Sequence, residues 1–172
     1  MDITFRPVPD FGNFEQPLRN IRAFLNETVL VVDLVPAAAE SVEREIPEST
    51  PEYMKVILGS AREIVEDDRF LRLDFGQVWG WMVHDEFAEN VAFSLPDSGW
   101  PKVPGFKHGH PLVEVVGSPW RAQVPEHQCG DNPNLCHFRI ISMTTYMDII
   151  AWRPEGRWLD ASSIPKIHLP EF

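Results

Sequence analysis

Apolar and polar positions alternate most regularly near the C-terminus, in residues 138–152, which are rich in β-branched and aromatic side chains and contain no Gly or Pro. A two-residue turn at Thr144-Thr145 would fold this stretch into an antiparallel hairpin. Its apolar face would carry Phe138, Ile140, Ser142, Met147, Ile149 and Ala151. On the opposite face, Arg139 and Asp148 would be diagonal neighbours of opposite charge. The pattern predicts a C-terminal hairpin at the centre of a sheet.

Helical spacing in the first part of the chain predicts two or three helices. The first would follow Asn13, with its apolar side chains at Leu18, Ile21, Phe24 and Leu25. A second, short and acidic, would occupy residues 37–46 after Pro36. A third would begin at Thr50 as the N-cap and Pro51 as the first helical residue. Its buried stripe would consist of Met54, Ile57, Leu58, Ala61, Ile64 and Val65.

Strand-like runs fill most of the remaining chain. A nearly continuous apolar run over residues 28–35 indicates a buried strand, and residues 70–83 alternate with period two around a turn or bulge at Gly76-Gln77. Shorter runs at residues 90–95 and 112–116 flank a loop rich in Pro and Gly. We therefore predict one α+β domain over residues 1–172, with a mainly antiparallel sheet, two or three N-terminal helices packed against it, and a weak subdivision near residues 96–111.

The net charge of −11 is unevenly distributed along the 172 residues. Residues 33–68 contain ten acidic against three basic side chains, residues 71–100 contain five against one, and from residue 101 onward seven of each cancel. Negative charge repels the phosphates of nucleic acids and the surface of anionic membranes. The composition therefore predicts no nucleic-acid partner and no membrane partner.

The cysteine content and the N-terminal residues favour a cytoplasmic location. Two cysteines, Cys129 and Cys136, form no disulfide framework, and whether they are paired, metal-bound or free stays open. The first residues show no charged segment followed by an apolar run, as a signal peptide would, and no segment has the length of a transmembrane helix.

One polar cluster has the spacing of a metal site. His108 and His110 would point the same way on a strand, and Glu114 follows four residues later. Over these seven residues the pattern His-x-His-x-x-x-Glu is similar to the metal-binding half-motif of cupins. The resemblance implies a divalent transition metal, and a metal-dependent enzyme is one alternative function.

Two tryptophans at period two, Trp79 and Trp81, allow a further alternative, a small-ligand module with a Trp-lined groove. Such residues more often belong to a core. The sequence contains no Gly-rich phosphate loop, no Gly-x-Ser-x-Gly elbow and no Cys-x-x-Cys pair. Our interpretation therefore leans towards a protein that is not an enzyme and has no cofactor.

The clustered acidity favours recognition of a basic protein, because opposite fields steer encounter and penalise wrong partners. The concrete hypothesis is an immunity protein or antitoxin that neutralises a toxin enzyme. Acidic side chains would form the rim of the interface and aromatic side chains its centre. The residues we expect there are Glu40, Glu43, Glu45, Glu63, Glu66, Asp67, Asp68, Trp79, Trp81, Asp85, Glu86, Glu89 and Trp100.

Overall fold

Nine antiparallel strands dominate the part of the chain that the computed structural model describes, namely residues 3–12, 14, 17–41, 46–59, 62–85, 110–125 and 134–163. The strands are β1 (Thr4–Pro7), β2 (Leu18–Asn26), β3 (Val29–Ser41), β4 (Arg62–Glu66), β5 (Arg69–Asp85), β6 (Leu112–Val116), β7 (Cys136–Ile141), β8 (Thr145–Ala151) and β9 (Glu155–Asp160). The helices are α1 (Glu52–Gly59) and three short 3-10 helices, η1 (Pro9–Phe11), η2 (Arg121–Gln123) and η3 (Ala161–Ser163).

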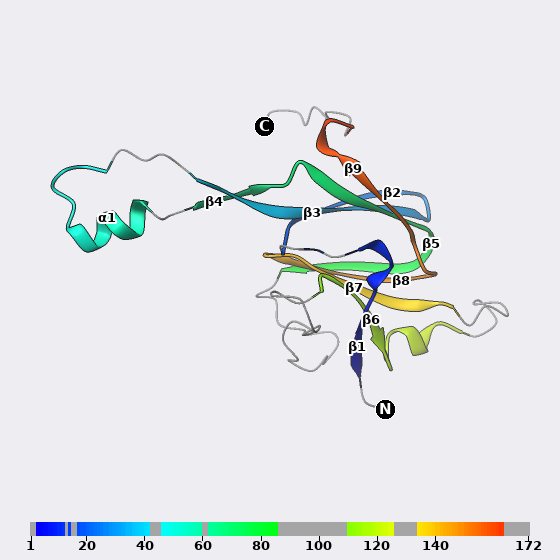
Figure 1. The fold of residues 1–172 in the computed structure, drawn as a ribbon. Coiled ribbons are helices and arrows are strands. Elements are labelled where there is room, and N and C mark those ends of the chain that lie inside the picture. The colour runs from blue at the N-terminus through cyan, green and yellow to red at the C-terminus, as the bar shows by residue number, and fades with distance from the viewer. Residues whose placement is uncertain are drawn as a thin grey trace.

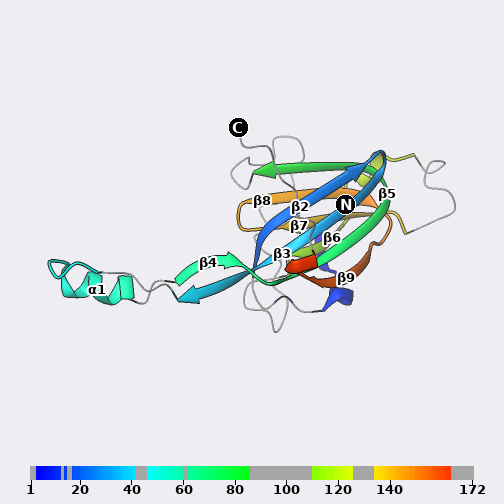
Figure 2. The same ribbon diagram turned by 90° about the horizontal axis from the view of Figure 1, so that it is seen from above.

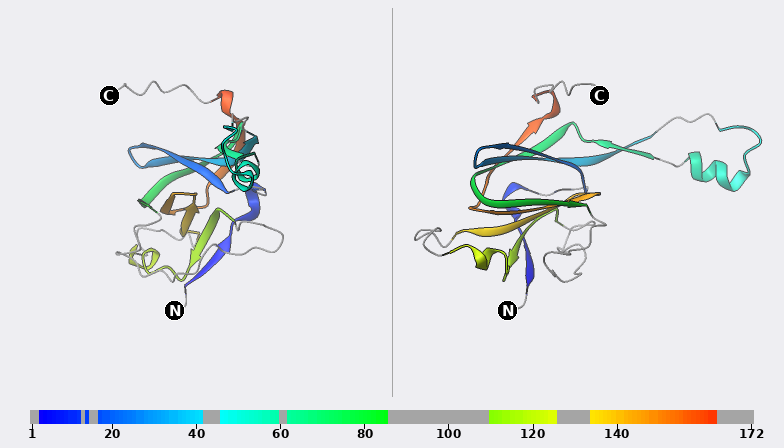
Figure 3. Two further views of the ribbon diagram at one scale, coloured as in Figure 1. Left: turned by 90° about the vertical axis from the view of Figure 1, so that its left-hand side faces the viewer. Right: turned by 180° about the vertical axis from the view of Figure 1, so that it is seen from behind.

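The strands are hydrogen-bonded in the order β1-β6-β7-β8-β5-β3-β2, with β4 paired to β3 and β9 paired to β5. They form two facing layers, one with β2, β3 and β9 and the other with β6, β7 and β8 (Figure 1). Two further views show the same layers (Figure 3). The long strand β5 joins them, because its first part pairs with β3 and β9 and its second part pairs with β8.

The passage of β5 between the layers depends on a bulge near Gly76. The register with β3 shifts between the pairs Val29–Gln77 and Val31–Asp74. Gly76 has a φ of 57°, a left-handed conformation that glycine adopts without a Cβ clash. Because a bulge bends its strand, β5 can continue into the second layer. The prediction of a strand with a turn or bulge at Gly76 is confirmed in its bulged form.

The main core lies between the two layers and follows the period-two pattern of the strands. Its buried side chains include Leu30, Val32, Leu34, Leu71, Leu73, Leu112, Phe138, Ile140, Met147 and Ile149. All of them are at most 2% exposed. The side chains of β7 and β8 that point away from this core therefore lie on the outer face of the layer that these strands form.

The C-terminal hairpin is present, with a register different from the predicted one. Phe138 pairs with Ile149 and not with Ala151, so the turn lies one residue earlier than Thr144-Thr145. Ser142 explains the shift, because its Oγ accepts the Thr145 N–H at 3.0 Å and donates to the Thr145 carbonyl at 2.9 Å. Each residue of β7 pairs with the β8 residue two positions before the predicted one. Because this shift is an even number of residues, each face of the hairpin keeps the predicted residues.

The expectation of an α+β fold with N-terminal helices is wrong. Residues 18–26 form strand β2, and residues 37–41 continue strand β3, while residues 42–45 of that predicted helix lie outside the description. Within the described ranges there is one α-helix, α1, and none of its residues is buried. The third predicted helix is thus shorter than expected and does not pack against the sheet, because Ile64 and Val65 of its expected stripe lie in β4.

Strand pairing explains why the helical spacing of residues 18–26 is overruled. β3 is buried on both faces from Val32 to Val35, and such a strand needs a hydrogen-bonded neighbour on each side. The two-residue turn at Glu27 and Thr28, with Glu27 at a φ of 55°, brings β2 directly alongside it. The pairing and the burial it provides outweigh local propensity.

Strands from the N-terminal half of the chain pair with strands from its C-terminal half at two places, since β1 pairs with β6 and β5 pairs with β8. The predicted strand at residues 90–95 and most of the proposed subdivision near residues 96–111 lie outside the described residues. Over the described ranges, no helix has the length and apolar character needed to cross a lipid bilayer.

Candidate functional site

An arm made of two strands and a helix projects from the body of the protein (Figure 1). Residues 37–41 at the end of β3 pair with β4, and α1 follows at the tip. We call residues 37–66 the arm. Seen from above, α1 lies at the end of the arm remote from the two layers (Figure 2). The arm is therefore the part of the described chain that reaches furthest from the core.

The helix at the tip exposes large apolar side chains. Tyr53 is 68% exposed, Val56 70% and Ile57 62%. Burying one such side chain stabilises a folded protein or a complex by about 1.5–3 kcal/mol. In the isolated chain, α1 does not gain this free energy. Exposed apolar clusters with polar surroundings are typical of interaction sites.

The surroundings of these apolar side chains are acidic. Residues 37–68 contain nine acidic and three basic side chains, a balance of −6 within the total of −11. More than half of the net charge thus belongs to the arm and the two residues that follow it. The arm combines an apolar tip, α1, with an acidic stem, the paired residues 37–41 of β3 and 62–66 of β4, which contain Glu40, Glu63 and Glu66 and one basic residue, Arg62.

Two of the stem carboxylates lie opposite each other across the strands. Glu40 and Glu63 are direct partners in the pairing of β3 with β4, and both are exposed. Directly opposite side chains have Cβ atoms about 4.5–5.5 Å apart, and like charges there are destabilising. A cationic group of a partner placed between them would relieve this repulsion.

The root of the arm is tied to the body. Arg22 of β2 forms an ion pair with Glu66, and the Asn20 amide donates to the other oxygen of the same carboxylate at 3.2 Å. Asp67 accepts the backbone N–H of Arg69 at 2.9 Å. Glu66 and Asp67 therefore have a local role in positioning the arm.

The structure brings only part of the predicted interface together. Glu40, Glu63, Glu66, Asp67 and Asp68 lie on or beside the arm. Asp85 is the last residue of β5 and pairs with Thr145, and its side chain is not among those that the structure describes. The predicted positions Glu43, Glu45, Glu86, Glu89 and Trp100 also lie outside it.

The two tryptophans proposed as a groove or an anchor differ in environment. Trp79 packs edge-to-face on Trp152, with ring centroids 4.3 Å apart, in a second apolar cluster that includes Trp120. Trp81 is 41% exposed on β5. Trp79 thus contributes to packing, and Trp81 is the member of the pair that a partner could reach.

The predicted metal ligands have separate contacts where they are described. His110 is buried, its Nδ1–H donates to the Leu112 carbonyl at 2.7 Å, and burial lowers its pKa. Glu114 accepts two hydrogen bonds from Arg6. His108 lies outside the described residues, and no metal-binding group of three or more His, Cys, Asp or Glu occurs among those that are described.

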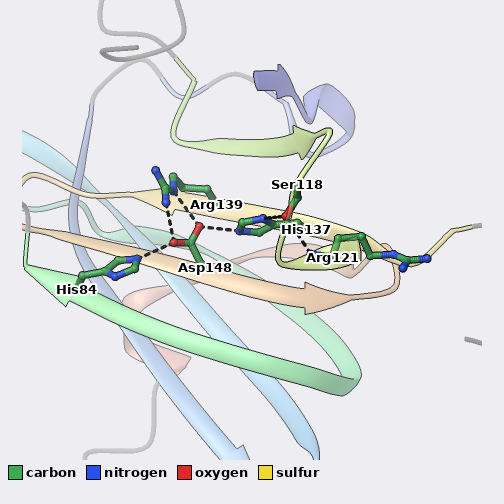
Figure 4. Close-up of polar contacts among 6 residues, drawn as sticks. All are labelled: His84, Ser118, Arg121, His137, Arg139 and Asp148. Carbon is green, nitrogen blue, oxygen red and sulfur yellow. Dashed lines mark hydrogen bonds and ion pairs between the residues drawn. The ribbon is translucent and has the colours of Figure 1, made fainter. Parts of the chain in front are cut away.

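The largest polar cluster of the described chain surrounds Asp148, on the outer face of β7 and β8 (Figure 4). Arg139 donates from Nε to Oδ1 and from Nη2 to Oδ2, both at 2.8 Å. His137 Nε2–H donates to Oδ1 at 2.8 Å, and His84 Nε2–H donates to Oδ2 at 2.6 Å. Burial alone would raise the pKa of Asp148, but these hydrogen bonds outweigh it and hold the pKa well below its usual range.

This cluster extends to Ser118, giving a Ser–His–Asp series. The Ser118 hydroxyl donates to His137 Nδ1 at 2.7 Å, while its Oγ accepts the backbone N–H of Arg121 at 3.0 Å (Figure 4). A serine activated in this way could act as a nucleophile only if a substrate reached it. Ser118 is 6% exposed, and its hydroxyl bonds both to the backbone N–H of Arg121, the first residue of η2, and to His137 of β7, so the arrangement ties the loop of η2 to the sheet.

Sequence reasoning missed Tyr53 and Val56, which lie on the exposed side of α1, and the connection of His84 and Ser118 to Asp148. A signal for the first pair was present, because apolar residues occur on both sides of this short helix and not in one stripe. His84 and Ser118 carry no such signal, since only the strand register brings them to Asp148.

The comparisons with known proteins assign no family. No protein-family model, no curated protein and no solved structure matches this chain. The function therefore has to be inferred from the exposed apolar tip, the acidic stem and the buried polar cluster.

Proposed function

We propose that this chain is a non-enzymatic binding protein that recognises a more basic protein through its arm and blocks it, as an immunity protein or antitoxin blocks a toxin enzyme. The observation that carries the proposal is α1, which exposes Tyr53, Val56 and Ile57 at the end of the arm. An exposed apolar surface of this kind gains free energy when a partner covers it.

The sign of the charge supports a basic protein as that partner. Residues 37–68 carry a balance of −6 in the sequence, so nucleic acids and anionic membranes would be repelled. A positively charged protein would be attracted over a distance of about one Debye length, which raises its association rate.

The burial of the polar cluster supports a role without catalysis. Ser118 and His137 are both buried, and each has its hydrogen-bonding groups engaged by Arg121, Asp148 or each other. Such a network stabilises a fold more readily than it transforms a substrate. A cytoplasmic location completes the proposal, in line with the low cysteine content.

Site-specific photo-crosslinking in cells of the native host tests the proposal. A benzophenone amino acid would replace Tyr53 at the tip, and a control variant would carry it at Gln123, an exposed residue of η2. We expect an adduct with a basic protein from position 53 and none from position 123.

The captured protein is then purified and its association rate with the full chain measured by stopped-flow fluorescence. The rate should fall about tenfold or more between roughly 20 and 300 mM salt, and equimolar chain should inhibit the activity of the captured protein. The proposal would be overturned by an acidic adduct, by no adduct, by an association rate that ignores salt, or by an uninhibited partner.

A further inference from the structure

We infer that α1 docks as a short helix into an apolar groove of the basic partner, and that arginine or lysine side chains at the rim of that groove contact the Glu40–Glu63 pair. This inference rests on the proposed function and specifies the partner's binding surface. It also assigns different roles to the two parts of the arm: affinity to the tip and steering to the stem.

The tip has the residue spacing of a helix that binds in a groove. Tyr53, Val56 and Ile57 stand at positions i, i+3 and i+4, so they share one face of α1. All three are more than 60% exposed. Helices recognised in grooves present their anchors at this spacing, and aromatic or aliphatic anchors at the centre of an interface carry most of its binding energy.

The helix also lacks sufficient stabilisation of its own. It has two turns, no buried residue and one intrahelical ion pair, between Glu52 and Lys55. Isolated helices shorter than about 12 residues are marginal in water, and one exposed ion pair adds little to their stability. A groove that buries the apolar face would supply what the body of the protein does not.

The stem supplies the electrostatic half of the interface. Glu40 and Glu63 are opposite each other on one face of the paired strands, and their repulsion is relieved when a cation lies between them. Arginine suits this position, because its planar guanidinium can donate to two carboxylates at once.

Charge also decides between the possible occupants of the apolar tip. A second copy of this chain would bring another balance of −6 over residues 37–68, and an anionic lipid surface has the same sign. Both would meet repulsion at the stem while covering the tip. A basic protein satisfies the tip and the stem together.

The test measures binding of full-length variants to the protein captured through position 53. The tip variant is Val56→Ser with Ile57→Ser, and its matched control is Val83→Ser, an apolar residue 49% exposed on β5 of the body. The stem variant is Glu40→Gln with Glu63→Gln. Its control is Glu27→Gln with Glu155→Gln, which changes the charge equally at exposed positions of the body.

The tip variant should weaken the equilibrium affinity by about thirtyfold or more, mainly through faster dissociation. The stem variant should slow association by about fivefold at low salt and show a smaller salt dependence. Both controls should bind within about twofold of the wild type, and all variants should unfold at the wild-type temperature, because the substituted side chains are exposed.

Failure of the proposed function and failure of this docking mode give different results. If the wild type captures no basic protein, the proposed function fails and the docking mode with it. If the wild type binds the captured protein and the tip variant binds it equally well, only this inference is overturned. A loss of binding in Val83→Ser would then identify the body as the docking surface. Equal effects of the stem variant and its control would overturn the proposed contact of the partner's cations with the Glu40–Glu63 pair.

Discussion

Arg139 and Asp148 face each other across β7 and β8 and are joined by two parallel hydrogen bonds of 2.8 Å. The guanidinium neutralises a carboxylate that is almost fully buried, and His84 and His137 complete its hydrogen bonding. The pair therefore fixes the central hairpin on the face opposite the main core. Buried pairs of this kind are costly to break one partner at a time.

Arg139→Met should lower the free energy of unfolding by about 3–5 kcal/mol, because it leaves the Asp148 carboxylate buried without its cation. Urea denaturation followed by tryptophan fluorescence measures this. Arg153→Met is the matched control: Arg153 also pairs with an aspartate, Asp10, but the two side chains are 58% and 45% exposed. The control should cost less than about 1 kcal/mol. Equal losses in both variants would contradict the structural role assigned to the buried pair.

Acid should weaken the fold partly through Asp148. Its pKa is held below the usual range in the folded protein, so its contribution to stability is complete above the ordinary aspartate pKa of about 3.9 and is lost progressively as the pH falls below that. Urea midpoints measured from about pH 6 downward should therefore fall less steeply with acidification in Asp148→Asn than in the wild type. Parallel profiles would show that other carboxylates account for the whole acid response.

The sequence allowed the strands with clear alternation to be predicted. The long strand around Gly76 and the C-terminal hairpin both follow period two, and Arg139 and Asp148 were recognised as neighbours before their exact register was known. The helix expected over residues 18–26 was wrong, because its spacing suits a helix while its partner β3 requires a strand. The local spacing of apolar residues contains no information about pairing with another strand.

The candidate site was predictable in its chemistry and not in its shape. The acidity of residues 33–68 is plain in the sequence, but the same charges would suit a helix packed on a sheet or a projecting arm. The pairing of Glu40 with Glu63 decides between these, and it depends on β4 being a strand. Ile64 shows the same difficulty, since we expected it in a buried stripe and it is exposed on β4.

Gly156→Ala should destabilise the contact between β9 and η1. A Cβ at position 156 would clash with two ring atoms of Phe11, whose carbonyl accepts the Trp158 Nε1–H at 2.8 Å. The ring would have to move while its backbone is held, which we expect to cost about 1–3 kcal/mol. Gly59→Ala in α1 is the control, because a Cβ there meets nothing within 4 Å and alanine favours a helix. Thermal unfolding compares the two, and a loss in Gly59→Ala as large as that in Gly156→Ala would contradict the close contact.

Cys136 should react slowly with alkylating reagents. Burial, followed by the nearby charge of Glu114, raises the pKa of its thiol to about 11. At pH 8 the thiolate fraction is then roughly a hundredfold below that of a free thiol. The greater nucleophilicity of a more basic thiolate recovers about tenfold, so alkylation by iodoacetamide should be roughly tenfold slower than for a free cysteine.

Two substitutions with opposite signs separate charge from burial at Cys136, in a chain carrying Cys129→Ser so that one thiol is measured. Glu114→Gln removes a negative charge that raises the thiol pKa, so alkylation should become faster. Arg6→Met removes a positive charge that lowers this pKa, so alkylation should become slower. If both variants change the rate in the same direction, the loss of the Arg6–Glu114 ion pair has opened the strand edge, and access to the thiol, not its charge environment, controls the reaction.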